Sequence, residues 1–204
     1  MDQSTEQIIL EAAAAQFAAK GYGGARVEEI AAAAGVNKAT LYYQIGDKAV
    51  LYGRVIDDLL RSVADRITAA LAAEQDPEQK VRAYVREFAA SARECQPLAP
   101  ILMREVAGGG ANLPDSALLQ MGRIVNALDQ AVRAGIASGV FRDVNPFIAH
   151  MLVVGSLSFF NAGAPIRARV AASQGLAFQP EVNMNHDEMT AQLSAMVLGA
   201  FRNA

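Results

Sequence analysis

The 204-residue chain has little of the chemistry on which enzymes and secreted proteins depend. Its single cysteine, Cys95, excludes an internal disulfide and fits a reducing compartment. Its two histidines, His150 and His186, fall on different predicted helices, and the neighbouring acids of His186 point in different directions on a helix. We therefore expect no catalytic residues, no metal and no cofactor. A nucleophilic pair of Cys95 and His150 is the one enzymatic alternative that these residue types leave open.

Long hydrophobic runs and a strong net charge are also missing. The most apolar run, Phe147 to Phe160, is interrupted by His150 and is shorter than the roughly 20 residues that a membrane span requires. The N-terminus is polar and lacks the pattern of a signal peptide, so we expect a cytoplasmic protein without a membrane partner. The formal net charge is −3, and the first fifty residues carry four basic and six acidic side chains. Non-specific attraction to a polyanion should therefore be modest.

The residues that are abundant favour helices. Apolar residues make up 52% of the chain, which is enough for a substantial core. Alanine is frequent, and alternating β-branched patterns are scarce, so we predict an all-α protein.

Residues 27–45 show the spacing of two short helices joined by a tight turn. Apolar residues recur at i, i+3, i+4 and i+7 on one face of the first helix, at Val27, Ile30, Ala31 and Ala34. Gly35 follows, where a left-handed backbone lets the chain turn, and Asn37 suits the N-cap of the second helix. Leu41 and Ile45 lie four residues apart and are expected to face inward.

The other face of the second helix is polar and aromatic. It presents Lys38, Ala39, Thr40, Tyr42, Tyr43 and Gln44. Two adjacent aromatic rings on a solvated face usually have something to contact, and a helix of this kind fits the major groove of DNA. The pattern predicts a DNA-binding helix-turn-helix over about residues 26–45. A helical hairpin within an ordinary all-α protein is the alternative.

The segment from Thr5 to about Leu60 resembles the N-terminal domain of TetR-type transcriptional regulators. The matching residues are Ile9, Ala12, Ala13, Phe17, Lys20-Gly21-Tyr22, Ile30-Ala31, Ala34-Gly35-Val36, Lys38, Thr40-Leu41-Tyr42 and Asp47-Lys48. The sequence departs from the family at Arg26, where a small hydroxyl residue is common. It also departs at Gln44 and Ile45, where histidine and phenylalanine are common: Ile45 keeps the core role, and Gln44 keeps a hydrogen-bonding edge but alters which base is read.

The resemblance implies an architecture and a set of DNA contacts. Residues 1–48 would form a three-helix DNA-binding domain, and residues 49–204 a helical bundle for effector binding and dimerisation, with about nine helices in all. We expect DNA contacts from Arg26, Asn37, Lys38, Ala39, Thr40, Tyr42, Tyr43, Gln44 and Lys48. Tyr42 and Lys48 should meet the DNA backbone, whereas Thr40, Tyr43 and Gln44 are candidates for base contact, together with Lys38 and the close approach that Ala39 allows.

The C-terminal part offers two further sets of expected residues. A pocket for an apolar small molecule would be lined by Tyr84, Phe88, Met103, Met121, Asn126 and Phe159, although each of these can equally be a core residue. By resemblance, a dimer interface would include Met151, Leu152, Leu157, Phe160, Leu193 and Val197. A loop of roughly twenty residues is expected after Gly163 and Pro165, including Gly175 and Pro180.

Together these features predict a homodimeric regulator, most simply a repressor, that binds double-stranded DNA at a palindromic operator. An apolar effector would release it by favouring a form with separated DNA-reading heads. Two alternatives stay open: a DNA-binding regulator controlled by a protein partner, and a helical enzyme or scaffold with an incidental helix-turn-helix.

Overall fold

The computed structural model describes residues 4–173 and 185–202, and within these ranges it has ten α-helices. They are α1 (Thr5–Gly24), α2 (Val27–Ala33), α3 (Lys38–Gln44), α4 (Lys48–Ala73), α5 (Pro77–Glu94), α6 (Leu98–Ala107), α7 (Asp115–Ala137), α8 (Pro146–Ala162), α9 (Ala164–Ala172) and α10 (His186–Phe201). The all-α prediction is confirmed.

The count is ten rather than about nine because α9 forms where a loop was expected. Pro165 stands in the first turn of α9, two positions after the N-cap residue Gly163. A proline in that place starts a helix as readily as it stops the preceding one. The rest of the expected loop, including Gly175 and Pro180, lies outside the described residues.

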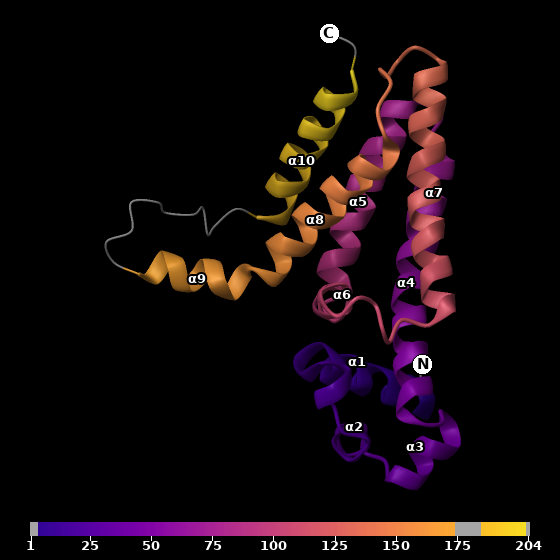
Figure 1. Cartoon of the computed structure of the whole chain (residues 1–204), viewed down its shortest axis with the longest axis vertical. Helices are drawn as coiled ribbons and strands as arrows, with labels where there is room; N and C mark the ends of the chain where they lie inside the picture. Colours follow the sequence, from indigo (N-terminus) through magenta and orange to yellow (C-terminus); the bar gives the residue numbers. More distant parts are fainter. Residues whose placement is uncertain (1–3, 174–184, 203–204) are drawn as a thin grey trace. The chain divides into compact units, whose positions relative to one another are not determined.

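The chain divides into two compact units. The first unit contains residues 1–62 and 95–121, and the second contains residues 63–94 and 122–204. Helices α1, α2, α3 and α6 therefore belong to the first unit, as does the beginning of α4 (Figure 1). The division of function between residues 1–48 and 49–204 stays a prediction.

The core of the first unit begins with α1. Ser4 caps this helix by accepting a hydrogen bond from the backbone N–H of Gln7, whose side chain accepts one from the Ser4 N–H in return. Ile9, Ala13 and Phe17, which are among the residues that carry the family resemblance, are fully buried. Near its end the helix kinks at Gly21, whose positive φ of 70° is easily adopted by glycine.

The second unit is built around α5, α8 and α10, which pack on one another. Asp76 caps α5 and Asn145 caps α8, each accepting from a backbone N–H in the first turn of its helix. Phe141 and Phe201 meet edge to face at 5.4 Å, and the Arg142 N–H donates to the Phe201 carbonyl at 2.8 Å. These contacts tie the segment after α7 to the end of α10.

No single helix among the described residues is long and apolar enough to cross a membrane. Helices α8 and α9 reach the required length and composition only as a pair bent by 55°.

Candidate DNA interface

The turn between α2 and α3 has the geometry that residues 27–45 predict. Gly35 adopts a positive φ of 67°, and the Val36 N–H returns to the Ala31 carbonyl at 3.0 Å. The Asn37 side chain caps α3 by accepting from the Thr40 N–H at 2.8 Å and from the Thr40 hydroxyl at 3.0 Å. The Thr40 hydroxyl proton is therefore already in use, so this oxygen meets a base most easily as an acceptor.

The two faces of α3 differ sharply in exposure. Leu41 has no exposed surface and Ile45 is also buried, so both anchor the helix as predicted. On the opposite face Tyr43 is 88% exposed, and Tyr42 is exposed as well. Lys38, Ala39 and Gln44 lie on the surface beside them, and Thr40 is half-buried. This small helix thus presents side chains capable of contacting DNA and is held from behind by aliphatic residues.

Ion pairs hold two lysines of the first unit, Lys38 on α3 and Lys20 on α1. Lys38 Nζ lies 2.5 Å from a Glu28 carboxylate oxygen, and Lys20 Nζ lies 2.7 Å from Glu29. The Lys38 ammonium lowers the pKa of Glu28 through their hydrogen bond, and Glu28 raises the pKa of Lys38 in the same way. Both groups therefore stay charged at neutral pH, and a DNA phosphate must compete with Glu28 for Lys38.

Lys48 and Arg26 are held differently. The Lys48 ammonium lies 4.7 Å from the centroid of the Tyr22 ring, a cation–π contact that leaves its charge without a carboxylate partner among the interactions described. Arg26 is exposed at the start of α2, where its backbone carbonyl accepts the first helical bonds. Sequence patterns did not reveal the acidic partners on α2, because ten residues separate Glu28 from Lys38.

Glu28→Gln tests whether the carboxylate competes with DNA. We expect the substitution to raise affinity for any duplex about two- to fivefold at low salt, because one like charge leaves the interface and Lys38 is released. Thermal stability should change little, since exposed ion pairs contribute little to folding. Fluorescence anisotropy with a labelled duplex measures the change.

Asp129→Asn is the matched control for Glu28→Gln. It removes a carboxylate from another exposed ion pair, with Arg133, and changes the net charge by the same amount. It belongs to the second unit. An equal gain in affinity from both variants would mean that only net charge matters and would contradict the assigned competition.

Two sequence profiles match most of the chain. The profile of "Bacterial regulatory proteins, tetR family" matches residues 9–55, and that of "Tetracyclin repressor-like, C-terminal domain" matches residues 74–161. The chain belongs to the TetR family. It is a DNA-binding transcriptional regulator, and TetR-family proteins are regulators, not enzymes. The alternative of an enzyme or scaffold is thereby excluded.

Individual relatives agree with this assignment. The transcriptional repressor NicS of Pseudomonas putida is 29% identical over 161 residues, which are 76% of this chain and 74% of NicS. The transcriptional regulator FadR of Bacillus subtilis, solved with stearoyl-CoA, matches 95% of this chain and 98% of its own with a TM-score of 0.74 at 15% identity. AibR, solved with isovaleryl coenzyme A and operator DNA, matches 95% of this chain and 97% of its own with a TM-score of 0.68 at 19% identity. At these identities the two structures show a shared TetR fold alone.

The residues expected to line an effector pocket are placed in different environments. Met103 and Met121 belong to the first unit, and the other four belong to the second. Tyr84 is fully buried and Phe88 half-buried, whereas Phe159 is 71% exposed. Phe159 therefore lies on the surface of its unit and not in an enclosed cavity, which corrects that part of the prediction. Asn126 lines an open groove of about 350 Å³ with Lys80 and Arg123.

Tyr84 has a partner that the sequence analysis missed. Its hydroxyl lies 2.6 Å from Nδ1 of His150, and its ring stacks near Phe88 at 6.2 Å. Burial raises the pKa of Tyr84 and lowers the pKa of His150. The phenol therefore keeps its proton and donates it to a neutral imidazole, which links α5 to α8. This bond gives His150 a structural partner within the second unit.

The residues expected at a dimer interface divide between surface and core. Met151 and Leu152 are exposed, but Leu157, Leu193 and Val197 are buried within the second unit. The last three cannot meet a partner chain directly, so their assignment is corrected to core. Phe160 is half-buried, with the Arg167 guanidinium 4.2 Å from its ring centroid.

Helix α8 nevertheless leaves an apolar stripe uncovered. Besides Met151 and Leu152, the stripe contains Phe147, Ile148 and Phe159, all exposed, while Ala149, Val153 and Leu157 pack inward. A helix that is apolar on both sides must be covered on more than one face. The i, i+4 and i+8 spacing of Ala149, Val153 and Leu157 groups these residues on one face of the helix, but the sequence alone does not tell which apolar face stays exposed.

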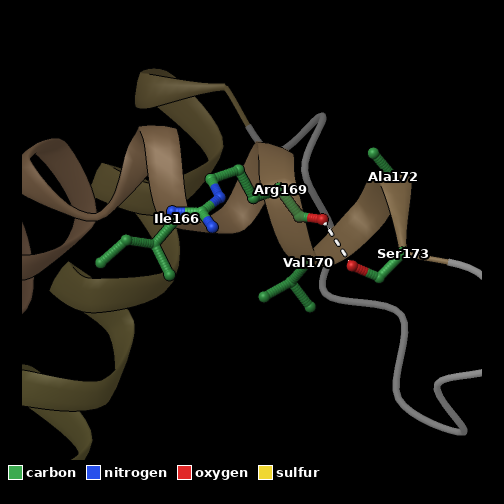
Figure 2. A pocket seen from close by; sticks show the side chains of 5 residues that line it. All are labelled: Ile166, Arg169, Val170, Ala172 and Ser173. Atoms are coloured by element: carbon green, nitrogen blue, oxygen red, sulfur yellow. Dashed lines mark hydrogen bonds between the residues drawn. The ribbon is translucent and has the colours of Figure 1, made fainter.

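A shallow hollow on α9 is a further candidate binding site. It measures about 470 Å³ and is lined by Ile166, Arg169, Val170, Ala172 and Ser173 (Figure 2). The Ser173 hydroxyl donates to the Arg169 carbonyl at 2.9 Å. All five residues belong to α9 or to its C-cap Ser173, so the hollow has no second wall among the described residues and holds none of the expected pocket residues.

Proposed function

We propose that this chain is a cytoplasmic, homodimeric repressor that binds a two-fold symmetric operator through Arg26, Asn37, the outer face of α3 and Lys48. A small molecule with an apolar chain releases it. The observation that carries the DNA-binding part is the contrast on α3 between the fully buried Leu41 and the almost fully exposed Tyr43. A helix anchored in this way can enter a major groove without unfolding its own core.

Different residues of this surface should act differently on DNA. Lys48 is a point charge on the first turn of α4 and suits a phosphate, whereas the Gln44 amide at the end of α3 suits a base edge. Lys48→Ala should weaken binding to every duplex and reduce the slope of affinity against salt by about one unit. Gln44→Ala should instead relax preference at one or two positions, at a cost of about 1–3 kcal/mol.

These two variants control for each other when both are measured on operator and scrambled duplexes across a salt series. The assigned roles require that Lys48→Ala lowers affinity for both the operator and the scrambled duplex. Gln44→Ala should lower affinity for the operator alone. Parallel losses on the two duplexes for both variants would refute the assignment.

A homodimer is supported by the exposed stripe of α8. Three of its large apolar residues, Phe147, Ile148 and Met151, lie within two turns of the helix. A self-complementary interface would remove this surface from water, and a two-fold symmetric regulator would then read half-sites about one DNA turn, 34 Å, apart. Met151→Glu should convert the protein to a monomer in sedimentation experiments. A dimer that persists in Met151→Glu would place the interface elsewhere.

An acyl thioester of coenzyme A is the first effector class to test. Solved structures of FadR and AibR contain stearoyl-CoA and isovaleryl coenzyme A. In this chain the second unit has an aromatic cluster of Tyr84, Phe88 and His150, and we propose that the acyl chain packs against it. Any such ligand must bind the DNA-free form more tightly than the DNA-bound form.

The test is a titration of the protein–operator complex with isovaleryl coenzyme A, stearoyl-CoA and unacylated coenzyme A. Release by an acylated form and not by coenzyme A supports the proposal. If none of the three compounds releases the operator, this effector class is rejected and control by a protein partner is favoured. The proposal of operator binding is unaffected by that result.

A further inference from the structure

A buried carboxylate joins α6 to the helices of the first unit. Glu105 is only 3% exposed, although it carries a charge. Its Oε1 accepts a hydrogen bond from the Tyr52 hydroxyl at 2.6 Å and from the Asn112 side-chain amide at 3.1 Å, and its Oε2 accepts from the Asn112 N–H at 3.2 Å. Three donors therefore satisfy a group that is otherwise costly to bury.

Tyr52 in turn contacts residues that lie next to the proposed DNA-binding residue Lys48. Burial and the bond to Glu105 raise the pKa of Tyr52, so its hydroxyl remains a donor. The Tyr52 ring contacts Phe17 at 4.7 Å and Tyr22 at 4.9 Å between centroids. Tyr22 in turn carries the Lys48 ammonium on its ring. A continuous series of contacts thus runs from α6 to a residue proposed to meet the DNA backbone.

A second contact from the preceding residue holds α6 to α1. Arg104 Nη2 donates to the Ala19 carbonyl at 3.0 Å, just before the kink at Gly21. The Arg104 side chain lies against Gly21, where an added Cβ would meet its Cδ at 3.4 Å. Arg104 and Glu105 therefore attach α6 to α1 and α4 at once, and the backbone contacts place residues 95–121 in the same compact unit as α1–α3.

We propose that Glu105 is a positioning residue for operator binding: through Tyr52 it fixes α6 to the DNA-binding helices, so that binding at α3 stabilises α6. This proposal rests on the proposed operator binding. Coupling between two sites is reciprocal, so a change that loosens α6 also weakens operator binding.

Hydrogen exchange measured by mass spectrometry tests the coupling without a known effector. The probe is an operator duplex selected by the wild-type protein. In the wild type we expect duplex binding to slow exchange of the α6 amides about tenfold, together with amides of α1–α3. The measured quantity is the ratio of the exchange rate of each α6 amide in the duplex-bound protein to its rate in the free protein. If Glu105 had only a structural role, this ratio would be the same in the Glu105 variants as in the wild type.

The decisive variant is Tyr52→Phe/Glu105→Leu. It replaces both buried partners by apolar side chains, which avoids leaving either one unsatisfied, and the exposed Asn112 can turn to water. The variant should bind the operator about fivefold more weakly, keep the protection of α1–α3 and lose the protection of α6. Glu105→Gln keeps an acceptor for Tyr52 and should retain most of that protection.

Protection of α6 in the double variant equal to that in the wild type would overturn the proposal. So would a wild type whose α6 is not protected when the duplex is bound. Failure of the wild type to select any duplex is a separate result: it would refute the proposed function first and this coupling with it.

Discussion

Gly135→Ala is expected to lower the free energy of unfolding of the second unit by about 3 kcal/mol. An added Cβ at Gly135 would lie 2.1 Å from Cδ2 and 2.4 Å from Cε2 of Phe141, far inside van der Waals contact. The Phe141 ring cannot easily move aside, because it is buried and packs edge to face on Phe201. Either α7 or the segment after it must therefore shift.

Gly122→Ala is the matched control, because it lies on the same helix with nothing within 4 Å of an added Cβ. It should stabilise the protein by about 0.5–1 kcal/mol, since alanine loses less backbone entropy than glycine in a helix. Urea unfolding followed by circular dichroism measures both changes. If the two substitutions have the same sign, the close packing of Phe141 against α7 is wrong.

Leu41→Ala should remove operator binding by destabilising the α3 anchor. Leu41 has no exposed surface, and truncation of such a residue to alanine costs about 2–5 kcal/mol. Helix α3 has only seven residues and cannot stay helical without tertiary packing. We therefore expect faster hydrogen exchange in residues 38–44 of the free variant and operator affinity reduced at least tenfold.

Tyr43→Ala on the same helix separates loss of structure from loss of contact. Tyr43 is almost fully exposed, so its truncation should change stability by no more than about 0.5 kcal/mol. Operator affinity should nevertheless fall, with free-state exchange in α3 unchanged. Normal operator binding by Tyr43→Ala, or faster exchange in its free α3, would contradict the separation of the two faces.

The parts of the fold that the sequence predicts correctly depend on local rules. The Asn37 cap, the turn at Gly35 and the inward pair of Leu41 and Ile45 follow from spacing within about ten residues. Helix α9 was missed because Gly163 and Pro165 end one helix and begin the next, so the same residues carry both signals.

Features that depend on distant packing were not predictable from one sequence. Glu105 and Tyr52 are separated by 53 positions, and no local pattern indicates that a glutamate on α6 is buried. On α10, Leu193 and Val197 share one face, and only the packing of that face decides whether it meets its own unit or a partner. The side of α8 that stays exposed was undetermined for the same reason.

Selection of bound duplexes from a random pool tests the central claim most directly. A two-fold symmetric regulator reading DNA through α3 should enrich inverted repeats whose half-sites are about one helical turn apart. Gln44→Ala should enrich the same repeats with one or two positions relaxed. A pool that stays random, or one enriched for a single asymmetric site that Gln44→Ala leaves unchanged, would contradict the account.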